Sequence, residues 1–392
     1  MKHTDLLIVG AGPFGLAVAA KAADSSLDYL MVGKSMEFWH RNMPKGMFLR
    51  SACDWHLDPA GLHTIEAFLA SQGKTPKEVE PLSLEFYLEY VEWFRAKKQI
   101  EPIPVYVRKL DYLQKDKRFI ATTFDDDSVS ASNVVLAPGF SNFPNIPAKL
   151  KARLPEGRFQ HTCEFVDFSK SAGKRYLIIG GRQSAFEWAA LLVEAGAAAV
   201  HLVHRHDSPA FKTSDWSWVS PLVQGMADNP GWFRNLSQSE KDSVSHRQWA
   251  EGRLKVEPWL ESRLPSDRVH IWPRVEVESC VDEGDLRVRL TDGTALSVDQ
   301  VILATGYKVN IRQLPYLAAG NTLELIETRN DFPVLDEHFE TSLKGLFITS
   351  FPATQDFGPF FGFTIAVRVS AELIIRRLLD KAPQRDLAIA KN

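Results

Sequence analysis

The sequence predicts an α/β fold of two Rossmann-like dinucleotide-binding domains, and two observations carry this prediction. Two glycine-rich turns lie about 170 residues apart, at residues 10–15 and 180–185. Each turn follows an apolar run typical of a strand and opens into an apolar run typical of a helix. A turn of this kind binds a dinucleotide only in such a strand–turn–helix context. Two of them therefore predict two bound dinucleotides.

The first turn reads Gly10-Ala11-Gly12-Pro13-Phe14-Gly15. Gly10 permits the tight turn, Gly12 lets the backbone approach a pyrophosphate, and Gly15 allows the helix to pack closely on the strand. The N-terminus of the following helix offers unpaired N–H groups and a positive dipole end to phosphates. We therefore predict a nucleotide site formed by Gly10, Gly12, Pro13, Phe14 and Gly15. The alternative is a plain connection between strand and helix.

The second turn reads Gly180-Gly181-Arg182-Gln183-Ser184-Ala185, and Arg182 occupies its second glycine position. A side chain there crowds the approach of a pyrophosphate, although a guanidinium could also pair with it. We predict that Gly180, Arg182, Gln183 and Ser184 contact the second dinucleotide.

The next strand of this unit, residues 199–203, ends in the basic cluster His204-Arg205-His206. An enzyme that uses NADH tends to carry an acidic residue at this point, for the ribose 2′-hydroxyl. The cluster therefore favours NADPH, with Arg205 at the 2′-phosphate. A solvated run of charges after a strand is the alternative.

Length and composition indicate a globular enzyme of two or three domains, with 392 residues, 45% hydrophobic residues and a net charge of −3. This charge leaves no basic footprint for nucleic acid or an anionic membrane. No run of the sequence reaches the ~18 to 20 apolar residues that span a bilayer. The three cysteines, Cys53, Cys163 and Cys280, form no CxxC pair. They predict reduced thiols and a cytoplasmic location, and we expect no metal site.

The order of the elements predicts one domain inserted in another. Residues 1–150 and 305–392 are expected to form the first domain, and residues 151–304 the second. The second domain leaves its strand–helix rhythm at about 208–265, in a polar insertion rich in tryptophan. Its tryptophans could line a substrate pocket, or they could build a small core of the insertion. They are Trp216, Trp218, Trp232, Trp249 and Trp259.

The chain resembles the class B flavoprotein monooxygenases, which include flavin-containing monooxygenases, amino-acid N-hydroxylases and Baeyer-Villiger enzymes. The motifs that carry the resemblance are residues 10–15, the segment 39–51, Ala137-Pro138-Gly139, His161 of a histidine fingerprint, residues 178–185, and Ala304-Thr305-Gly306-Tyr307. The resemblance implies glutathione-reductase-like domains, with FAD at the first turn and NADPH at the second. The NADPH domain would then be inserted in the FAD domain.

Further site residues follow from this resemblance. Trp39, Arg50 and Ser51 are expected where the chain crosses the flavin face, and Gly139, Thr305, Gly306 and Tyr307 in the cofactor motifs. Gly358 and Phe360 belong to a turn before the C-terminal helix, whose positive end resembles the dipole that stabilises reduced flavin near N1 and O2. The alternative is a loop that packs on its own domain.

Asp54 and His56 are the only close acid–base pair in the segment that crosses the flavin face by resemblance. We predict that they handle protons there, and a purely structural role is an equal alternative.

The sequence departs from the family pattern at four places, and the most consequential is Arg182 at the second glycine position of the NADPH turn. Gly33-Lys34 stands where an acidic residue usually binds the FAD ribose, so the ribose must be held in another way. The histidine fingerprint lacks its first aromatic residue, since Pro155 occupies that position. Phe165 is followed by Val166-Asp167 instead of the Trp-Pro of Baeyer-Villiger enzymes, which favours the branches that hydroxylate heteroatoms.

These observations predict an FAD-dependent, NADPH-using monooxygenase. It would oxygenate a small organic substrate with O2, at nitrogen or another heteroatom, through a C4a-(hydro)peroxyflavin. The main alternative is a flavin-dependent oxidase or dehydrogenase that does not use NADPH, because Arg182 fits a relic coenzyme domain. A disulfide reductase would need a cysteine pair, and a non-enzymatic FAD-binding module is a further alternative. The sequence leaves the substrate and the oligomeric state open.

Overall fold

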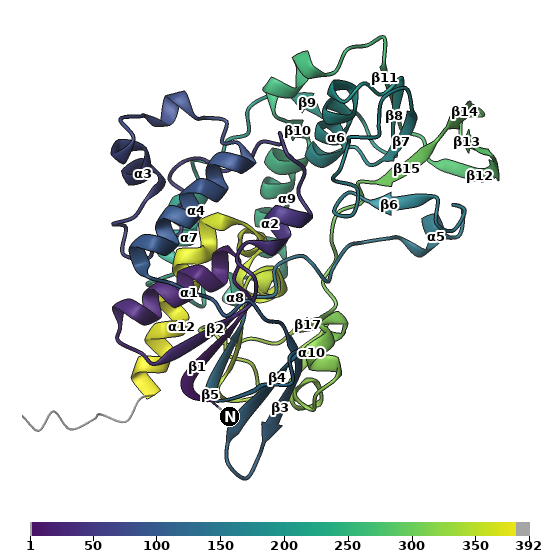
Figure 1. Cartoon of the computed structure of the whole chain (residues 1–392). Coiled ribbons are helices and arrows are strands. Elements are labelled where there is room, and N and C mark those ends of the chain that lie inside the picture. The colour runs from purple at the N-terminus through teal and green to yellow at the C-terminus, as the bar shows by residue number, and fades with distance from the viewer. Residues whose placement is uncertain (1, 382–392) are drawn as a thin grey trace, which may run out of the picture.

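Two separate β-sheets organise the protein. The structure is a computed structural model that describes residues 2–381, so the predicted domain ends at residues 1 and 392 lie outside the described residues. In Figure 1 the second sheet lies at the upper right and the first sheet lies below it. The α/β class and the two dinucleotide-binding units are confirmed. The boundaries at 150/151 and 304/305 stay a prediction.

The first sheet has the strand order β2-β1-β5-β4-β3, and β18 pairs with the C-terminal half of β5. β1 runs parallel to β2 and β5, whereas β3 and β4 add an antiparallel edge. The central strands are apolar and buried, as expected of a sheet covered on both faces. The strands are β1 Lys2–Val9, β2 Tyr29–Val32, β3 Val107–Leu113, β4 Arg118–Thr123, β5 Ser128–Leu136 and β18 Leu346–Ile348.

Helices α1 and α12 pack against each other beside this sheet (Figure 1). A salt bridge of 2.5 Å between Lys21 and Glu372 joins them. Ser83 is the N-cap residue of α4, and its hydroxyl accepts a hydrogen bond from the N–H of Phe86. The helices of this unit are α1 Pro13–Asp24, α2 Glu37–Arg41, α3 Ile65–Ser71, α4 Leu84–Lys98, α10 Pro315–Ala318, α11 Thr354–Phe357 and α12 Val367–Lys381. A short hairpin, β16 Thr328–Arg329 and β17 Phe332–Pro333, lies near α10.

The second sheet is fully parallel, in the order β11-β8-β7-β15-β6. Its strands are β6 Phe159–His161, β7 Arg175–Ile179, β8 Ala199–His204, β11 Val269–Pro273 and β15 Gln300–Leu303. Its helices are α5 Ala148–Lys151 and α6 Gln183–Glu194. A three-stranded antiparallel sheet stands beside them, formed by β12 Val277–Glu283, β13 Asp285–Leu290 and β14 Ala295–Val298.

The tryptophan-rich insertion has no separate core cluster and packs on both units, with Val256 and Leu260 in the core of the second. Val219, Val223 and Phe233 belong to the large core cluster of the first unit, and Trp216, Trp218 and Trp232 pack against that cluster. The elements are β9 Ala210–Phe211, α7 Val219–Gly225, α8 Trp232–Asn235, α9 Gln238–Arg253, β10 Lys255–Val256 and the 3-10 helix η2 Pro258–Arg263. The insertion therefore links the two units across the site.

The chain passes from one sheet to the other twice, once near Asn145 and once near Gly306, and these two crossings are hydrogen-bonded to each other. The N–H of Asn145 donates to the carbonyl of Gly306 (2.9 Å), and the Asn145 side-chain amide donates to Thr305 (3.2 Å). His161 Nε2 contacts the Gly306 carbonyl at 3.0 Å, so the fingerprint histidine joins one crossing to the other. Among residues 2–381, no helix combines the length and the apolar character that crossing a bilayer requires.

Candidate active site

A cavity of about 1490 Å³ lies between the two glycine-rich turns. It is lined by both turns, by the crossing segments and by α9 of the insertion. Most of the predicted cofactor residues line it, namely Gly10, Gly12, Pro13, Phe14, Trp39, Arg50, Ser51, Gly139, Arg182, Gln183, Ser184, Thr305, Gly306, Tyr307 and Phe360. Gly15, Gly180, Arg205, Gly358, Asp54 and His56 lie outside the lining.

The three glycines of the first turn have three different surroundings. A Cβ on Gly10 would lie 2.4 Å from the carbonyl oxygen of Ala137, and one on Gly15 would lie 1.9 Å from the Gly10 oxygen. These two positions are fixed by close backbone packing. A Cβ on Gly12 would meet no atom within 4 Å. Because Gly12 lines the cavity, the empty space at this residue belongs to the ligand site.

The end of β2 has no carboxylate and needs glycine. Gly33 has φ +132°, and a Cβ there would lie 3.1 Å from the N atom of Ala11. The ammonium group of Lys34 lies 5.4 Å from the ring centre of Tyr106. A carboxylate that lines the cavity at this end is Glu37 on α2, whose Oε1 accepts a hydrogen bond from Arg41 at 3.0 Å.

Arg50 and Ser51 reach the cavity, and both are anchored to distant parts of the chain. Arg50 Nε donates to the Glu257 carboxylate and Nη1 to the Gly252 carbonyl, both at 2.7 Å. The Ser51 hydroxyl lies 3.3 Å from that of Thr364. Arg50 therefore contributes to the cavity wall chiefly by tying the segment from the first unit to the insertion.

Asp54 and His56 point away from the cavity, toward α7 and α12. Asp54 accepts a hydrogen bond from Ser220 at 3.2 Å, and His56 Nε2 lies 2.8 Å from a guanidinium nitrogen of Arg368. Burial and the charge of Arg368 lower the pKa of His56 to about 4. Trp55, between them, lines the cavity instead. The chain turns at Cys53-Asp54, where the Trp55 N–H donates to the Ala52 carbonyl (3.1 Å), and the geometry does not favour proton transfer by this pair into the cavity.

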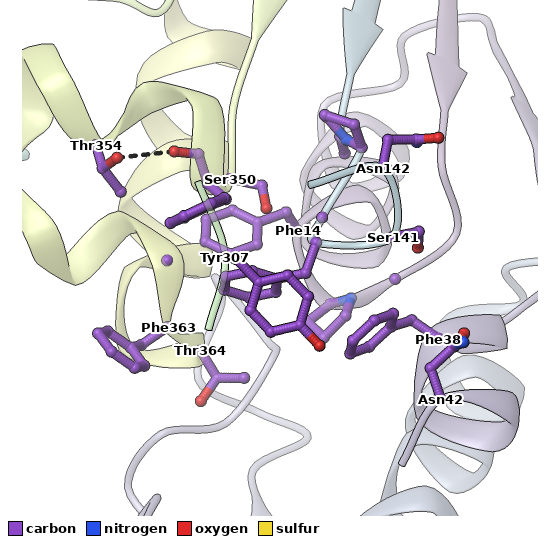
Figure 2. A pocket seen from close by; sticks show the side chains of 18 of the residues that line it. Phe14, Phe38, Asn42, Ser141, Asn142, Tyr307, Ser350, Thr354, Phe363 and Thr364 are labelled. Carbon is purple, nitrogen blue, oxygen red and sulfur yellow. Dashed lines mark hydrogen bonds between the residues drawn. The ribbon is translucent and has the colours of Figure 1, made fainter. Parts of the chain in front are cut away.

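Aromatic side chains form one wall of the cavity. Figure 2 shows Tyr307 at the centre, with Phe38 and Asn42 to one side and Phe363 and Thr364 to the other. The ring centre of Phe140 lies 5.0 Å from that of Tyr307, and the Phe38 ring lies 6.1 Å from it. Rings packed at these distances exclude water from the space beside them.

The C-terminal turn predicted at Gly358 and Phe360 forms 3-10 helices before α12 begins at Val367. Phe360 is buried and lines the cavity. Gly358 has φ +96°, and a Cβ there would lie 3.0 Å from the Phe233 ring. Gly358 therefore shapes the turn without itself reaching the cavity.

The second turn is as tightly packed as the first, except at Arg182. A Cβ on Gly180 would lie 2.4 Å from the Ala304 carbonyl oxygen, and one on Gly181 would lie 2.5 Å from the His204 ring. The backbone of Arg182 is extended, with φ −121° and ψ −178°. Its side chain turns to the end of α9, where Nη1 donates to the Arg253 carbonyl. The crowding expected from the sequence is therefore avoided.

The basic cluster after β8 divides into a buried and an exposed part. His204 is buried against Gly181, and its ring stacks on His206 with 4.7 Å between ring centres. Arg205 is exposed and close enough to Arg182 to help lower its pKa, after the larger effect of burial. The contact of Arg205 with a 2′-phosphate stays a prediction.

Glu187 on α6 is a site residue that the sequence motifs do not include. It is fully buried, lines the cavity, and accepts the N–H of Phe48 at 2.7 Å. Burial raises the pKa of this carboxyl to about 7, although the Phe48 N–H and the charge of Arg263 act against this. The sequence signal was a single charge in the apolar run Ala185-Phe186-Glu187-Trp188-Ala189. Glu187 thus joins α6 to the segment that carries Arg50.

The two turns fit FAD and NADPH respectively. At the first turn, the unfilled space at Gly12 faces the N-terminus of α1, which has no side-chain cap. At the second turn, α6 also begins without a side-chain cap; Arg182 is its N-cap residue, and after burial the charges of Arg253 and Arg205 lower the pKa of Arg182. Uncapped N–H groups and guanidinium groups suit phosphates.

Comparison with known proteins supports this assignment. The fold matches that of the ornithine N-hydroxylase KtzI from Kutzneria sp. 744, with a TM-score of 0.79, 16% identity, and coverage of 97% of this chain and 100% of that one. The chain is 24% identical to the probable indole-3-pyruvate monooxygenase YUCCA9 of Arabidopsis thaliana, over 78% of this chain and 75% of the relative. It is 26% identical to a ferredoxin–NADP reductase of Thermus thermophilus, over 88% and 83%.

The resemblance to class B flavoprotein monooxygenases is confirmed by these similarities. Sequence models of the pyridine nucleotide-disulphide oxidoreductase family match residues 7–229 and residues 246–349. The three cysteines are free thiols, so the disulphide chemistry in that name has no cysteine pair here among the described residues. The chain belongs to the pyridine nucleotide-disulphide oxidoreductase family.

Proposed function

We propose that this protein is an FAD-dependent, NADPH-using monooxygenase that oxygenates a small organic substrate at nitrogen or another heteroatom. One observation carries the proposal: a single cavity of about 1490 Å³ reaches from the first turn to the second and extends along α9. Such a cavity lets a flavin, a nicotinamide and a substrate meet at one place.

The assignment of the two cofactors rests on named groups of the chain. The N-terminus of α1 and Gly12 would hold the FAD pyrophosphate, and the N-terminus of α6 would hold the pyrophosphate of NADPH. When bound, the flavin supplies electron transfer from the coenzyme and the activation of O2. The aromatic wall at Phe38, Phe140 and Tyr307 keeps water from this chemistry.

Polar groups along α9 support a small polar substrate. Gln238, Asp242 and Ser245 line the cavity from one side of the helix, and Lys241 lies beside them. Asp242 accepts a hydrogen bond from Gln238 at 2.8 Å, so its second oxygen is available to a donor. The ornithine N-hydroxylase KtzI was solved with L-orn, a small molecule that carries amino groups. We infer a substrate of this general size and polarity.

The structure removes the main reason for the alternative of a flavin-dependent oxidase. That alternative rested on Arg182 as a sign of a relic coenzyme domain, yet the Arg182 side chain leaves the turn and lines the cavity. The similarity to a ferredoxin–NADP reductase makes electron transfer without oxygenation an outcome to be tested.

A purified FAD-loaded enzyme would be mixed anaerobically with NADPH, and flavin absorbance followed by stopped flow. We expect rapid bleaching. In air, a panel of amines, amino acids and aromatic metabolites would then be screened for NADPH oxidation, H2O2 release and products that gain one oxygen atom. A true substrate raises NADPH oxidation and lowers H2O2 per NADPH.

Two other results would contradict the proposal. Flavin that stays oxidised under saturating NADPH but bleaches with a panel compound would identify an oxidase. Bleaching by NADPH followed by electron transfer to added ferredoxin, with no oxygenated product from any compound, would identify a reductase.

A cytoplasmic location is part of the proposal. Cys53 and Cys163 are buried and Cys280 is partly buried, and all three are free. Unpaired thiols persist in a reducing compartment. Separation of cell fractions followed by immunodetection would test the location.

A further inference from the structure

Three arginines bring positive charge to the second turn and its surroundings. Arg182 belongs to the turn, Arg205 follows β8, and Arg253 ends α9. After burial, the charges of Arg253 and Arg205 lower the pKa of Arg182. Within residues 2–381 none of the three makes an ion pair. Positive charges brought this close to one another favour a bound anion.

Arg182 has donors to spare for such an anion. Its Nη1 donates to the carbonyl of Arg253, and its guanidinium carbon lies 5.3 Å from the ring centre of Trp249. A guanidinium offers five N–H donors in a fixed fork. Arg182 and Arg253 both line the cavity, so a ligand there can reach both side chains.

Helix α9 depends on this junction for its position. None of its sixteen residues is buried, so core packing holds it only weakly. Three side chains donate to its C-terminal carbonyls, namely Ser214 at Glu251 (2.7 Å), Arg50 at Gly252 (2.7 Å) and Arg182 at Arg253. The same helix presents Asp242 and Ser245 to the cavity.

We propose that Arg253 and Arg182 together bind the pyrophosphate of the coenzyme, and that this contact fixes α9 over the substrate end of the cavity. The inference rests on the proposed use of NADPH. It assigns a coenzyme-binding residue to the insertion, which the two glycine-rich turns alone do not contain. Arg182 then bridges the coenzyme and the α9 carbonyl, so that coenzyme and substrate bind with positive coupling.

The coenzyme carries a pyrophosphate and a 2′-phosphate, and binding to each can be tested separately by isothermal titration calorimetry of the FAD-loaded enzyme. The probes are NADP+, NAD+ and 2′-AMP, which carries the 2′-phosphate without the pyrophosphate. Arg253→Ala should weaken NADP+ and NAD+ by a similar factor of about ten, through loss of a charge-assisted contact, and leave 2′-AMP unchanged. Arg205→Ala should weaken NADP+ and 2′-AMP and spare NAD+.

Arg247→Ala is the matched control. Arg247 lies on α9 as well, but its guanidinium packs on the Trp218 ring at 4.2 Å. This variant should bind all three probes as the wild type does. Equal FAD content and circular dichroism in every variant would establish that each one folds.

Hydrogen exchange measures the second half of the proposal. NADP+ should slow amide exchange in residues 238–253 of the wild type, and this protection should be lost in Arg182→Ala and Arg253→Ala. Protection that survives in both variants would overturn the coupling, and equal losses for all three probes would overturn the pyrophosphate contact. A wild type that binds neither coenzyme would overturn the proposed function together with this inference. Normal coenzyme binding by Arg253→Ala would overturn the inference alone.

Discussion

The two glycine-rich turns share one backbone design and differ in what surrounds it. At the first turn, Gly12 faces open space, and no charged side chain stands among the first eight residues of α1. At the second turn, Arg182 takes the place of that glycine and is bonded to the insertion, and α6 carries the buried Glu187. The first site is thus made of backbone, and the second is made of backbone and side chains together.

The difference shows how one motif can serve a resident and a transient ligand. A cradle made of backbone alone suits a cofactor that stays bound. Where side chains from another segment complete a site, ligand binding can change the conformation of that segment. The charge at the second turn is therefore expected to matter for exchange and coupling, and the geometry at the first turn for retention.

The largest expected effect is at Gly12. Gly12→Val should reduce bound FAD from about one per chain to nearly none, because the branched side chain fills the only unfilled glycine position of the first turn. The apoprotein should remain folded, since no protein atom lies within 4 Å of the added Cβ. FAD content after gel filtration and circular dichroism measure the two quantities.

Gly225→Val provides the control for this change. A Cβ on Gly225 also meets nothing within 4 Å, but this residue does not line the cavity. It should keep its FAD. A folded Gly12→Val protein with full FAD content would remove the first turn from the site.

The next effect concerns Glu187, a buried acidic residue of α6 that has no counterpart in the first turns of α1. Its carboxyl keeps a proton up to about pH 7, whereas an unfolded glutamate loses it near pH 4.5. The folded state therefore binds more protons in this window, and the wild-type free energy of unfolding falls as the pH rises through it. Glu187→Gln removes this slope, so its stability relative to the wild type should rise by about 3 kcal/mol between pH 4.5 and 7.

Urea unfolding of wild type and variant across this pH range measures the difference. Glu85→Gln is the matched control, since the exposed Glu85 carboxylate also accepts a backbone N–H, from Gly46 in the same segment. This control measures the effect of neutralising a surface carboxylate that makes the same kind of contact. Parallel curves for Glu187→Gln and wild type would mean that the buried carboxyl titrates normally.

The smallest effect is expected at Arg205. Arg205→Ala should raise KM for NADPH about tenfold and leave KM for NADH nearly unchanged, as loss of one charge-assisted contact to the 2′-phosphate implies. Steady-state kinetics with both coenzymes measure it. Equal losses with both would instead assign Arg205 to the general architecture of the second turn.

The sequence was sufficient for most of the fold because the strands are strongly apolar and end in recognisable turns. The apolar run before the second turn is β7, Arg175–Ile179, and the strand predicted at residues 199–203 is β8, which extends to His204. The C-terminal helix expected after the turn at Gly358 and Phe360 begins at Val367, and a 3-10 helix at residues 364–366 precedes it. The local pattern could not separate these two helical forms, which share φ and ψ values closely.

The site was only partly predictable, because contacts between distant segments decide where a side chain points. Proximity in sequence suggested Asp54 and His56, yet packing against α12 turns His56 away. Arg50 and Arg182 were expected at cofactors; both line the cavity, and both also bond to the end of α9, which the sequence did not indicate. No pattern in the sequence predicts that Arg253 lies beside Arg182.

The pairing of β18 with β5 affects the order in which the two units can fold during synthesis. The sheet that carries the FAD turn takes in residues 346–348, and α12 from residue 367 onward packs on α1. The parallel sheet of the second unit is complete once residues 300–303 have emerged from the ribosome. During synthesis the coenzyme unit can therefore fold first, although its residues come second. The FAD site, which the chain begins at residue 10, is finished last.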